Sequence, residues 1–304
     1  MYKIADAHCD YLAFQVIKDN KGRLFDHIDI KRMKQGGVAL QNFAVWVPPE
    51  TKNRLALGSA QIEYFQRFID SSGGEVRSCA VSDCLETGGG ICALLSIESG
   101  ESINCENEYI SFAYEKGVRI LSLTWNDENE YASGCLAQGG LKAEGIAAVK
   151  LLNSLKIALD VSHINEKGFR EALELYEHAP CATHSCVYDL HENPRSLKND
   201  QIKELIGRDG FIGINFYTRF LTGRDADIDD ILDHIDYVLD CGGENSVGFG
   251  SDFCGIESTP QGLDSVADFQ ALPQAMLRRN FTDALIKKIC YGNFARYILK
   301  FLKQ

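Results

Sequence analysis

Eight short apolar runs, separated by segments with helical periodicity, are the feature that most restricts the fold of this chain. The runs are rich in β-branched residues and lie at 4–9, 38–47, 91–98, 118–125, 156–162, 180–184, 211–216 and 246–252. Helical segments are expected near 56–71, 105–116, 143–154, 166–178, 199–207 and 227–241. Strands that alternate with helices form parallel sheets, and eight such strands close a barrel. The pattern therefore predicts an α/β fold, a (β/α)8 TIM-type barrel.

The remaining stretch fits the same single domain. The chain has 304 residues, and one barrel of this kind commonly uses about 250. Residues 265–303 have the pattern of C-terminal helices, with a plausible helix start at 280–285 and an apolar docking face at 295–302. Because no low-complexity segment or Pro/Ser-rich linker interrupts the chain, we expect one domain over residues 1–304.

Charge and hydropathy exclude several classes of partner. A net charge of −12 argues against binding to nucleic acid or to an anionic membrane, since a polyanion would be repelled. The sequence has neither an N-terminal signal peptide nor a run of roughly 18 apolar residues that could span a bilayer. We therefore expect a cytoplasmic protein.

Eleven cysteines are scattered along the chain without a CxxC pair. In a reducing compartment such residues are usually small buried hydrophobes, and we expect that role for most of them. Cys9 and Cys254 each lie beside a candidate site residue.

Six side chains that can bind metal stand at the ends of the expected strands, where a barrel of this kind places its chemistry. They are His8, Asp10, Glu98, His163, His184 and Asp252. His8 and Asp10 are two residues apart, so a strand points both to the same face. Imidazoles and carboxylates are ligands for zinc or a similar divalent ion, and burying so much charge at one rim is costly unless cations balance it. The rim is therefore predicted to be a metal centre.

The number of candidates predicts two zinc ions, because one catalytic zinc needs only about three protein ligands. Glu98 would bridge the ions, with His8 and Asp10 completing one site and His163 and His184 the other. A water held between the ions would have its pKa lowered toward neutrality and would supply a hydroxide nucleophile.

Two further residues are expected to act on a substrate. Asp252 is left as the proton carrier between the attacking water and a leaving amine, the alternative being a turn or helix-cap aspartate. Arg195 could clamp a substrate carboxylate through its planar guanidinium, the alternative being a solvated surface arginine.

With these residues in place, the chain resembles the renal (membrane) dipeptidase family of zinc metallopeptidases. The resemblance runs nearly end to end and rests on Asp6-Ala7-His8-Cys9-Asp10, Ser96-Ile97-Glu98-Ser99-Gly100, Asp160-Val161-Ser162-His163, Thr183-His184-Ser185, Asn193-Pro194-Arg195, Asn215-Phe216-Tyr217, the run from His234-Ile235-Asp236-Tyr237 through Val247-Gly248-Phe249-Gly250-Ser251-Asp252-Phe253, and Gly292-Asn293-Phe294. The Gly-Phe-Gly-Ser-Asp-Phe stretch and the spacing of 21 between the last two histidine ligands are its most specific parts.

The resemblance implies a barrel hydrolase with two zinc ions on the ligands named above and with Glu98 shared. It also implies Asp252 as the acid/base residue and Arg195 on the C-terminal carboxylate of a dipeptide, often with a D-residue accepted at the second position. Members of the family are frequently homodimers, so a homodimer is expected here.

Two positions depart from the family pattern. Many members have a histidine after Leu-Thr at the end of the fourth strand, in contact with substrate near the scissile carbonyl, whereas this chain has Trp125. Tryptophan donates one hydrogen bond but carries no proton or charge, so Asn126 is a second candidate for substrate binding. Cys254 replaces a common aspartate.

Two other functions are weighed against the dipeptidase. One is an amidohydrolase acting on another small amide, such as an N-acyl amino acid or a β-lactam, with Trp125 reshaping the pocket. The other is a catalytically silent metal-binding module, which the retention of every ligand and of Asp252 disfavours. Nucleophile-elbow, His-Glu-x-x-His, phosphate-loop and dinucleotide-binding motifs are absent from the sequence.

Overall fold

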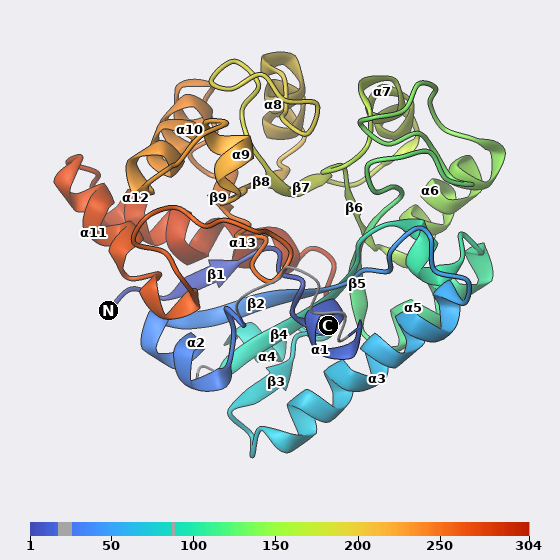
Figure 1. Ribbon diagram of the computed structural model, residues 1–304, viewed down its shortest axis with the longest axis horizontal. Coiled ribbons are helices and arrows are strands. Elements are labelled where there is room, and N and C mark those ends of the chain that lie inside the picture. Colours follow the sequence, from blue (N-terminus) through green and yellow to red (C-terminus); the bar gives the residue numbers. More distant parts are fainter. Residues whose placement is uncertain (18–25, 87–88, 304) are drawn as a thin grey trace.

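The computed structural model describes residues 1–17, 26–86 and 89–303, and within them the strands form one closed parallel barrel (Figure 1). The strands are β1 (Ile4–Asp6), β2 (Val38–Val45), β3 (Val76–Ser78), β4 (Ile91–Ile97), β5 (Val118–Ser122), β6 (Ala158–Asp160), β7 (Cys181–Ser185), β8 (Phe211–Ile214) and β9 (Val247–Phe249). They lie in the order β2-β1-β9-β8-β7-β6-β5-β4-β3, and β2 also pairs with β4. That last pairing closes eight strands into a ring, while β3 adds to the first half of β4.

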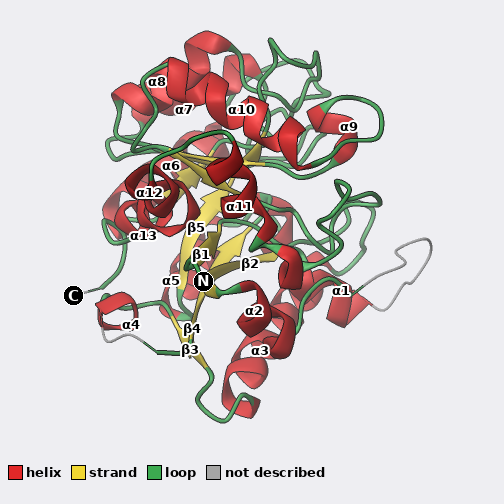
Figure 2. Ribbon diagram, turned by 90° about the vertical axis from the view of Figure 1, so that its left-hand side faces the viewer, coloured by secondary structure: helices red, strands yellow, loops and turns green. Residues whose placement is uncertain are grey.

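Helices surround the barrel, with the strands enclosed between them (Figure 2). They are α1 (Tyr11–Ile17), α2 (Ile30–Gly36), α3 (Arg54–Ser71), α4 (Asp83–Glu86), α5 (Asn107–Glu115), α6 (Ala143–Leu155), α7 (Glu166–Leu175), α8 (Asn199–Gly207), α9 (Thr218–Leu221), α10 (Ile228–Asp240), α11 (Ala271–Arg278), α12 (Asp283–Lys287) and α13 (Asn293–Ile298). Short turns of other helix types lie at η1 (Gly100–Ile103), η2 (Val266–Asp268) and η3 (Lys288–Gly292).

The predicted barrel and C-terminal helices are confirmed, and each of the eight expected runs overlaps a barrel strand. Four helices and one strand were not anticipated: α1, α2, α4, α9 and β3. These elements have between three and seven residues, which is too short for a periodic apolar pattern to stand out.

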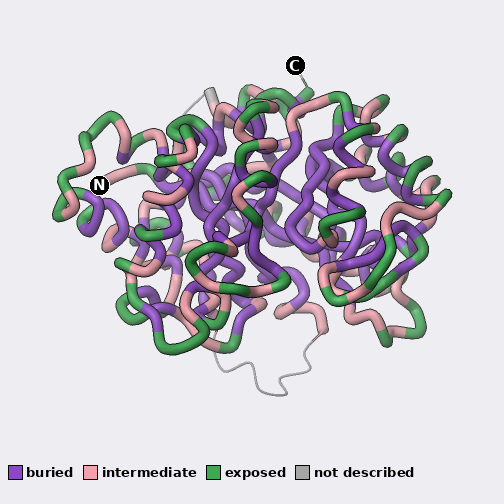
Figure 3. The backbone as a smooth tube through the Cα atoms, turned by 90° about the horizontal axis from the view of Figure 1, so that it is seen from above, coloured by how far each residue is buried: buried purple, intermediate pink, exposed green. Residues whose placement is uncertain are grey.

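The C-terminal helices close the floor of the barrel, at the ends where the strands begin. One buried cluster joins inward-facing strand residues such as Leu40, Leu94 and Ile120 to Phe294 and Ile298 of α13. A larger cluster of buried residues fills the layer between the strands and the outer helices. Figure 3 shows that the buried segments occupy the middle of the molecule. Because side chains fill the end of the barrel where the strands begin, binding is expected at the opposite rim, where the strands end.

Two expectations about the whole chain can be compared with the structure. Across the described residues, no helix combines the length and the apolar character needed to cross a membrane. All eleven cysteines are free thiols; nine are buried, whereas Cys135 and Cys241 are partly exposed. The expectation that most cysteines are small buried residues is therefore confirmed.

Candidate metal centre

The six predicted metal-competent residues come together at the rim where the strands end. Glu98 directly follows β4, His184 lies within β7, and the others follow β1, β6 and β9 by two to four residues. All six side chains are buried, with at most 9% of the residue exposed. The barrel thus brings together six residues that are spread over 245 residues of sequence.

Glu98 stands at the centre of this cluster. Its Oε1 lies 2.8 Å from His163 Nε2 and 3.7 Å from His184 Nε2, and its Oε2 lies 3.3 Å from His8 Nε2. Two sets of potential ligand atoms share this carboxylate, one with His8 and Asp10 and one with the other two histidines; within each set the atoms lie within 4.8 Å of one another. A carboxylate placed in this way has one oxygen available for each of two cations.

A single hydroxyl fixes the orientation of two of the imidazoles. Thr183 Oγ1 donates its proton to the Asp160 carboxylate, which can only accept. The same oxygen must then accept from Nδ1 of His8 at 3.3 Å and from Nδ1 of His184 at 2.9 Å. Asp160 is held in turn by the Thr183 backbone N–H and by Ser162, each donating to Oδ1. Both imidazoles therefore carry their proton on Nδ1, and the lone pair on Nε2 faces Glu98.

Asn126 fixes the orientation of the third imidazole, that of His163. Its Oδ1 lies 2.9 Å from His163 Nδ1 and accepts the proton of that nitrogen. The Nε2 of His163 is again left to face Glu98 and His184 Nε2, which is 2.9 Å away. Three lone pairs from three strands thus converge on one carboxylate, the arrangement that metal-ligating histidines need.

The chemistry of this cluster fits zinc. In the described chain, His8 Nε2 and Glu98 Oε2 are buried and make no hydrogen bond. Buried polar atoms are nearly always hydrogen-bonded, so two orphaned ligand atoms that face each other indicate a missing partner. Imidazole nitrogen and carboxylate oxygen form a common donor set for zinc, and a divalent cation would also neutralise the buried acids.

Burial controls the protonation of the cluster in the metal-free protein. It raises the pKa of Glu98 to about 8, with the nearby Asp252 charge adding to the effect. It lowers the pKa of His163 and of His184 well below the ordinary value, and the Arg195 charge lowers both further. At neutral pH these two imidazoles are therefore neutral and ready to ligate, whereas Glu98 retains its proton until a cation replaces it.

Asp252 is brought to the cluster by a continuation of the β1–β9 pairing. Beyond the strand ends, the Asp252 N–H donates to the carbonyl of His8 at 3.1 Å, and the N–H of Asp10 donates to the carbonyl of Phe253 at 2.8 Å. The Asp252 backbone turns with φ of 61°, while its carboxylate accepts from Asn215 Nδ2 at 2.9 Å. Burial raises the pKa of this carboxyl to about 7, and the Asp10 charge adds to the rise.

Gly255 leaves the space in which these two aspartates lie. A Cβ at this position would stand 1.9 Å from Asp10 Oδ2 and 2.7 Å from Asp252 Oδ1. No side chain could occupy that volume without moving a carboxylate. The turn Ser251–Gly255 therefore positions Asp252 and at the same time makes room for it.

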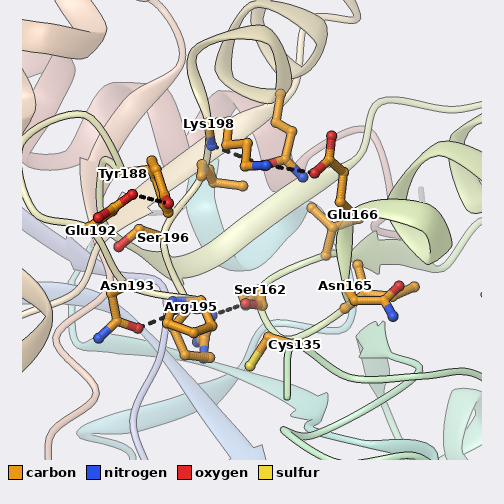
Figure 4. A pocket seen from close by; sticks show the side chains of 15 residues that line it. Cys135, Ser162, Asn165, Glu166, Tyr188, Glu192, Asn193, Arg195, Ser196 and Lys198 are labelled. Atoms are coloured by element: carbon orange, nitrogen blue, oxygen red, sulfur yellow. Dashed lines mark hydrogen bonds and ion pairs between the residues drawn. The ribbon is translucent and has the colours of Figure 1, made fainter. Parts of the chain in front are cut away.

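Arg195 is buried rather than solvated, although it comes from a loop between β7 and α8 (Figure 4). The Asn193 side chain accepts from the Arg195 backbone N–H at 2.9 Å, and the guanidinium donates to the carbonyls of Ser162 and His184. Its Nη2 lies 3.2 Å from His163 Nε2. The guanidinium consequently stands at the edge of the ligand cluster, with a cavity of about 530 Å³ on the side drawn in Figure 4.

A cavity of about 220 Å³ opens on the cluster. Its polar wall includes Asp10, Glu98, His163, Arg195 and Asp252, and its other walls include Trp46, Trp125, Asn126, Tyr217 and Phe220. The two indole rings are tilted by 59° relative to each other, with centroids 5.4 Å apart. This volume is below the roughly 300–1,000 Å³ of pockets for drug-sized ligands, so the cavity suits a small substrate.

The structure gathers the predicted metal-binding and substrate-binding residues into or around one cavity, and it adds others to them. Asp160, Thr183 and Asn215 orient site residues through the hydrogen bonds described above, and Trp46 lines the cavity. The first three lie inside motifs that carried the family resemblance, but their positioning role has no signal in sequence spacing. Trp46 lies within the apolar run 38–47 and would be interpreted there as a core residue.

Comparison with known proteins is consistent with this geometry. A profile of the membrane dipeptidase family (peptidase family M19) matches residues 1–302. An uncharacterised dipeptidase of Schizosaccharomyces pombe is 29% identical over 97% of this chain and 79% of its own length. Among solved structures, a metallopeptidase from Rhodobacter sphaeroides, liganded with a phosphinate mimic of the dipeptide L-Ala-D-Ala, is 26% identical with a TM-score of 0.91 over 99% of both chains. A family M19 dipeptidase is 27% identical with a TM-score of 0.91, covering 99% of this chain and 98% of its own.

Proposed function

Because the chain belongs to the membrane dipeptidase family, peptidase family M19, we propose that it is a binuclear zinc enzyme that hydrolyses dipeptides, including those with a D-residue at the second position. The observation that carries the proposal is the position of Glu98 between two sets of ligand atoms. Three imidazoles that present Nε2 to this carboxylate support the same conclusion.

Zinc bound at these residues would polarise the peptide carbonyl and make hydroxide available near neutral pH. Asp252 then has the proton-transfer role. With a pKa raised to about 7, its carboxyl can accept a proton from the attacking water and return it to the leaving amine at similar pH. Asn215 holds this carboxyl toward the cavity through Oδ2.

Arg195 is assigned to the C-terminal carboxylate of the dipeptide. Its guanidinium lines the cavity beside His163, so a carboxylate bound there would place the peptide bond near the ligand cluster. The relative crystallised with a mimic of L-Ala-D-Ala supports acceptance of a D-residue at this end of the substrate.

The aromatic residues are assigned to the substrate side chains. Trp46, Trp125, Tyr217 and Phe220 line the cavity and give it apolar surface for these side chains. In this arrangement Asn126 lines the cavity while its Oδ1 holds His163.

The substitution Asp252→Asn tests the proton-carrier role. It keeps the size of the side chain and the contact with Asn215 but removes the titrating group, so we expect kcat for dipeptides to fall by about 10²–10⁴-fold. Zinc content measured on the same sample must equal that of the wild type. Wild-type turnover by the fully metallated variant across neutral pH would exclude this role.

Metal counting and a substrate panel test the remainder of the proposal. Zinc reconstitution should reach two ions per chain, and one ion or none would remove the bridging role of Glu98. Dipeptides with an L- or D-residue at the second position should be cleaved in preference to N-acyl amino acids and β-lactams. Preference for an acylated N-terminus would identify an amidohydrolase of a different specificity.

The homodimer and the cytoplasmic location stay predictions from the sequence. Sedimentation of the zinc-loaded protein tests the first: we expect twice the mass of the 33.8 kDa chain. Fractionation of the producing cells tests the second.

A further inference from the structure

Three thiols lie together at the opposite end of β4 from Glu98. Cys92 is near the start of β4, Cys79 follows β3, and Cys84 lies in α4. All three are buried in the cluster of residues that fills the barrel floor. The pairing of β3 with β4 places Cys79 beside this part of β4, because its N–H donates to the carbonyl of Ala93 at 2.7 Å.

Two of these sulfurs are closer than a non-bonded contact. Cys84 Sγ lies 2.6 Å from Cys92 Sγ. Non-bonded carbon atoms already stay about 3.5–4.0 Å apart and sulfur is larger, whereas bonded sulfurs are about 2.03–2.05 Å apart. The two side chains therefore point at each other, and a small movement would bring them to bonding distance.

The surroundings also favour the thiolate form of one of the two sulfurs. Hydrogen bonds from the neighbouring thiols lower the pKa of Cys84 to about 4, and the Arg77 charge lowers it further. Arg77 Nη2 donates to the Cys84 carbonyl at 3.4 Å, which keeps that charge close. The pKa of Cys92 is raised to about 12, so this partner remains a thiol. A thiolate beside a thiol is the starting state for thiol–disulfide exchange.

We propose that Cys84 and Cys92 are a redox-reactive pair that a small-molecule disulfide oxidises to an intramolecular disulfide. The Cys84 thiolate attacks one sulfur of the external disulfide, forms a mixed disulfide and releases one small thiolate. Cys92 then gives up its proton and attacks Cys84 Sγ, forming the protein disulfide and releasing the second small thiolate. Two protein thiols are oxidised, the external disulfide is reduced, and the released thiolates take up the available protons.

Cys135 and Cys241 provide an internal comparison. Both are more exposed than the proposed pair, but their sulfurs contact asparagine side chains, those of Asn126 and Asn199. If exposure alone controlled oxidation, these two thiols would react first. If the proximity of two sulfurs controls it, Cys84 and Cys92 react first and become linked to each other.

The test uses the zinc-loaded protein, whose proposed metal ligands include no cysteine. It is incubated with graded ratios of reduced to oxidised glutathione, quenched with acid, alkylated and mapped by peptide mass spectrometry. We expect a Cys84–Cys92 cross-link and a fall in alkylatable thiols from eleven to nine, reversed by a dithiol reductant. Cys84→Ser and Cys92→Ser should each abolish the cross-link, while Cys79→Ser should retain it.

Several results would overturn the proposal. One is glutathionylation of Cys135 or Cys241 under conditions in which Cys84 and Cys92 remain alkylatable. Another is a cross-link that includes Cys79. A third is a metal ion, additional to those of the rim, that Cys84→Ser releases and that protects the thiols from oxidation. The wild-type map alone separates the first two results from the expected one, and the metal content of the wild type detects an additional ion, so the test holds even if a serine variant fails to fold.

Discussion

Glu98→Gln should stabilise the metal-free protein at alkaline pH and destabilise the zinc-loaded protein. Burial raises the pKa of Glu98 from its ordinary value of 4.5 to about 8 in the folded chain. Between these two pH values the folded state holds a proton that the unfolded state has lost, so stability falls as pH rises and the loss is complete above the folded pKa. Glutamine has nearly the same shape but does not ionise, so the stability of the variant does not fall with pH through this residue.

The magnitude follows from the same two values. At about 1.36 kcal/mol per pH unit, the rise from 4.5 to about 8 corresponds to a loss on the order of 5 kcal/mol for the wild type. That is a large part of the roughly 5–15 kcal/mol by which a domain is stable. The nearby Asp252 charge contributes to the raised pKa of Glu98, so the measured difference between the two proteins includes this repulsion.

The assay is urea unfolding of chelator-treated protein at pH 5 to 9, followed by tryptophan fluorescence. The chain has two tryptophans, and both Trp46 and Trp125 line the cavity. We expect equal stabilities near pH 5 and a gap that widens up to pH 8 in favour of the variant. With zinc added the order should reverse, because glutamine is a weaker ligand. Parallel pH dependences of the two metal-free proteins would refute the reasoning.

Further predictions concern the residues around the ligands. Thr183→Val removes the hydroxyl that orients two imidazoles and should weaken zinc binding by about 10–100-fold in a chelator competition assay; Thr183→Ser is the control that should retain it. Gly255→Ala should displace Asp10 and lower both zinc content and kcat, and normal values of both would show that the turn can adapt. Arg195→Gln should raise KM for dipeptides far more than for dipeptide amides, which lack the carboxylate; an equal effect on both would exclude the clamp. Trp125→Phe keeps an aromatic ring, although a smaller one, and removes the N–H, so it should leave kcat nearly unchanged if Trp125 acts only as a wall, whereas a large fall in kcat would identify a donor.

The sequence was sufficient to predict that the candidate ligands lie together, because their placement follows from strand alternation and from the position of chemistry in a barrel. Strand alternation brings His8 and Asp10 to one face, and the rule that chemistry lies where barrel strands end brings Glu98, His163 and His184 to the same rim. The same rule places Asp252. These predictions required only the order of the strands, which the apolar runs indicate.

The orienting contacts could not be predicted because they depend on distances between strands that are far apart in the chain. Thr183 meets His8 across 175 residues of sequence, and nothing in the spacing of either residue indicates the contact. Arg195 was weighed against a solvated arginine because loop residues are usually exposed, yet its guanidinium is held by carbonyls that only the folded loop supplies. The Cys84–Cys92 contact likewise arises from a four-residue helix that has no sequence signature.

The pKa shifts and the hydrogen-bond network both indicate that this rim favours metal binding over the stability of the metal-free protein. A cluster built for stability would place a cation of the chain itself against both oxygens of Glu98, but here three imidazoles present Nε2 to this carboxylate. In the metal-free state that arrangement costs stability, since it keeps a buried carboxyl protonated at a pH where water would ionise it. Zinc binding removes this penalty and adds about 2.7 kcal/mol at a free concentration of 100 Kd. Folding and metal binding are therefore coupled, and the lower stability of the metal-free protein is a reason to expect that the protein binds metal in the cell.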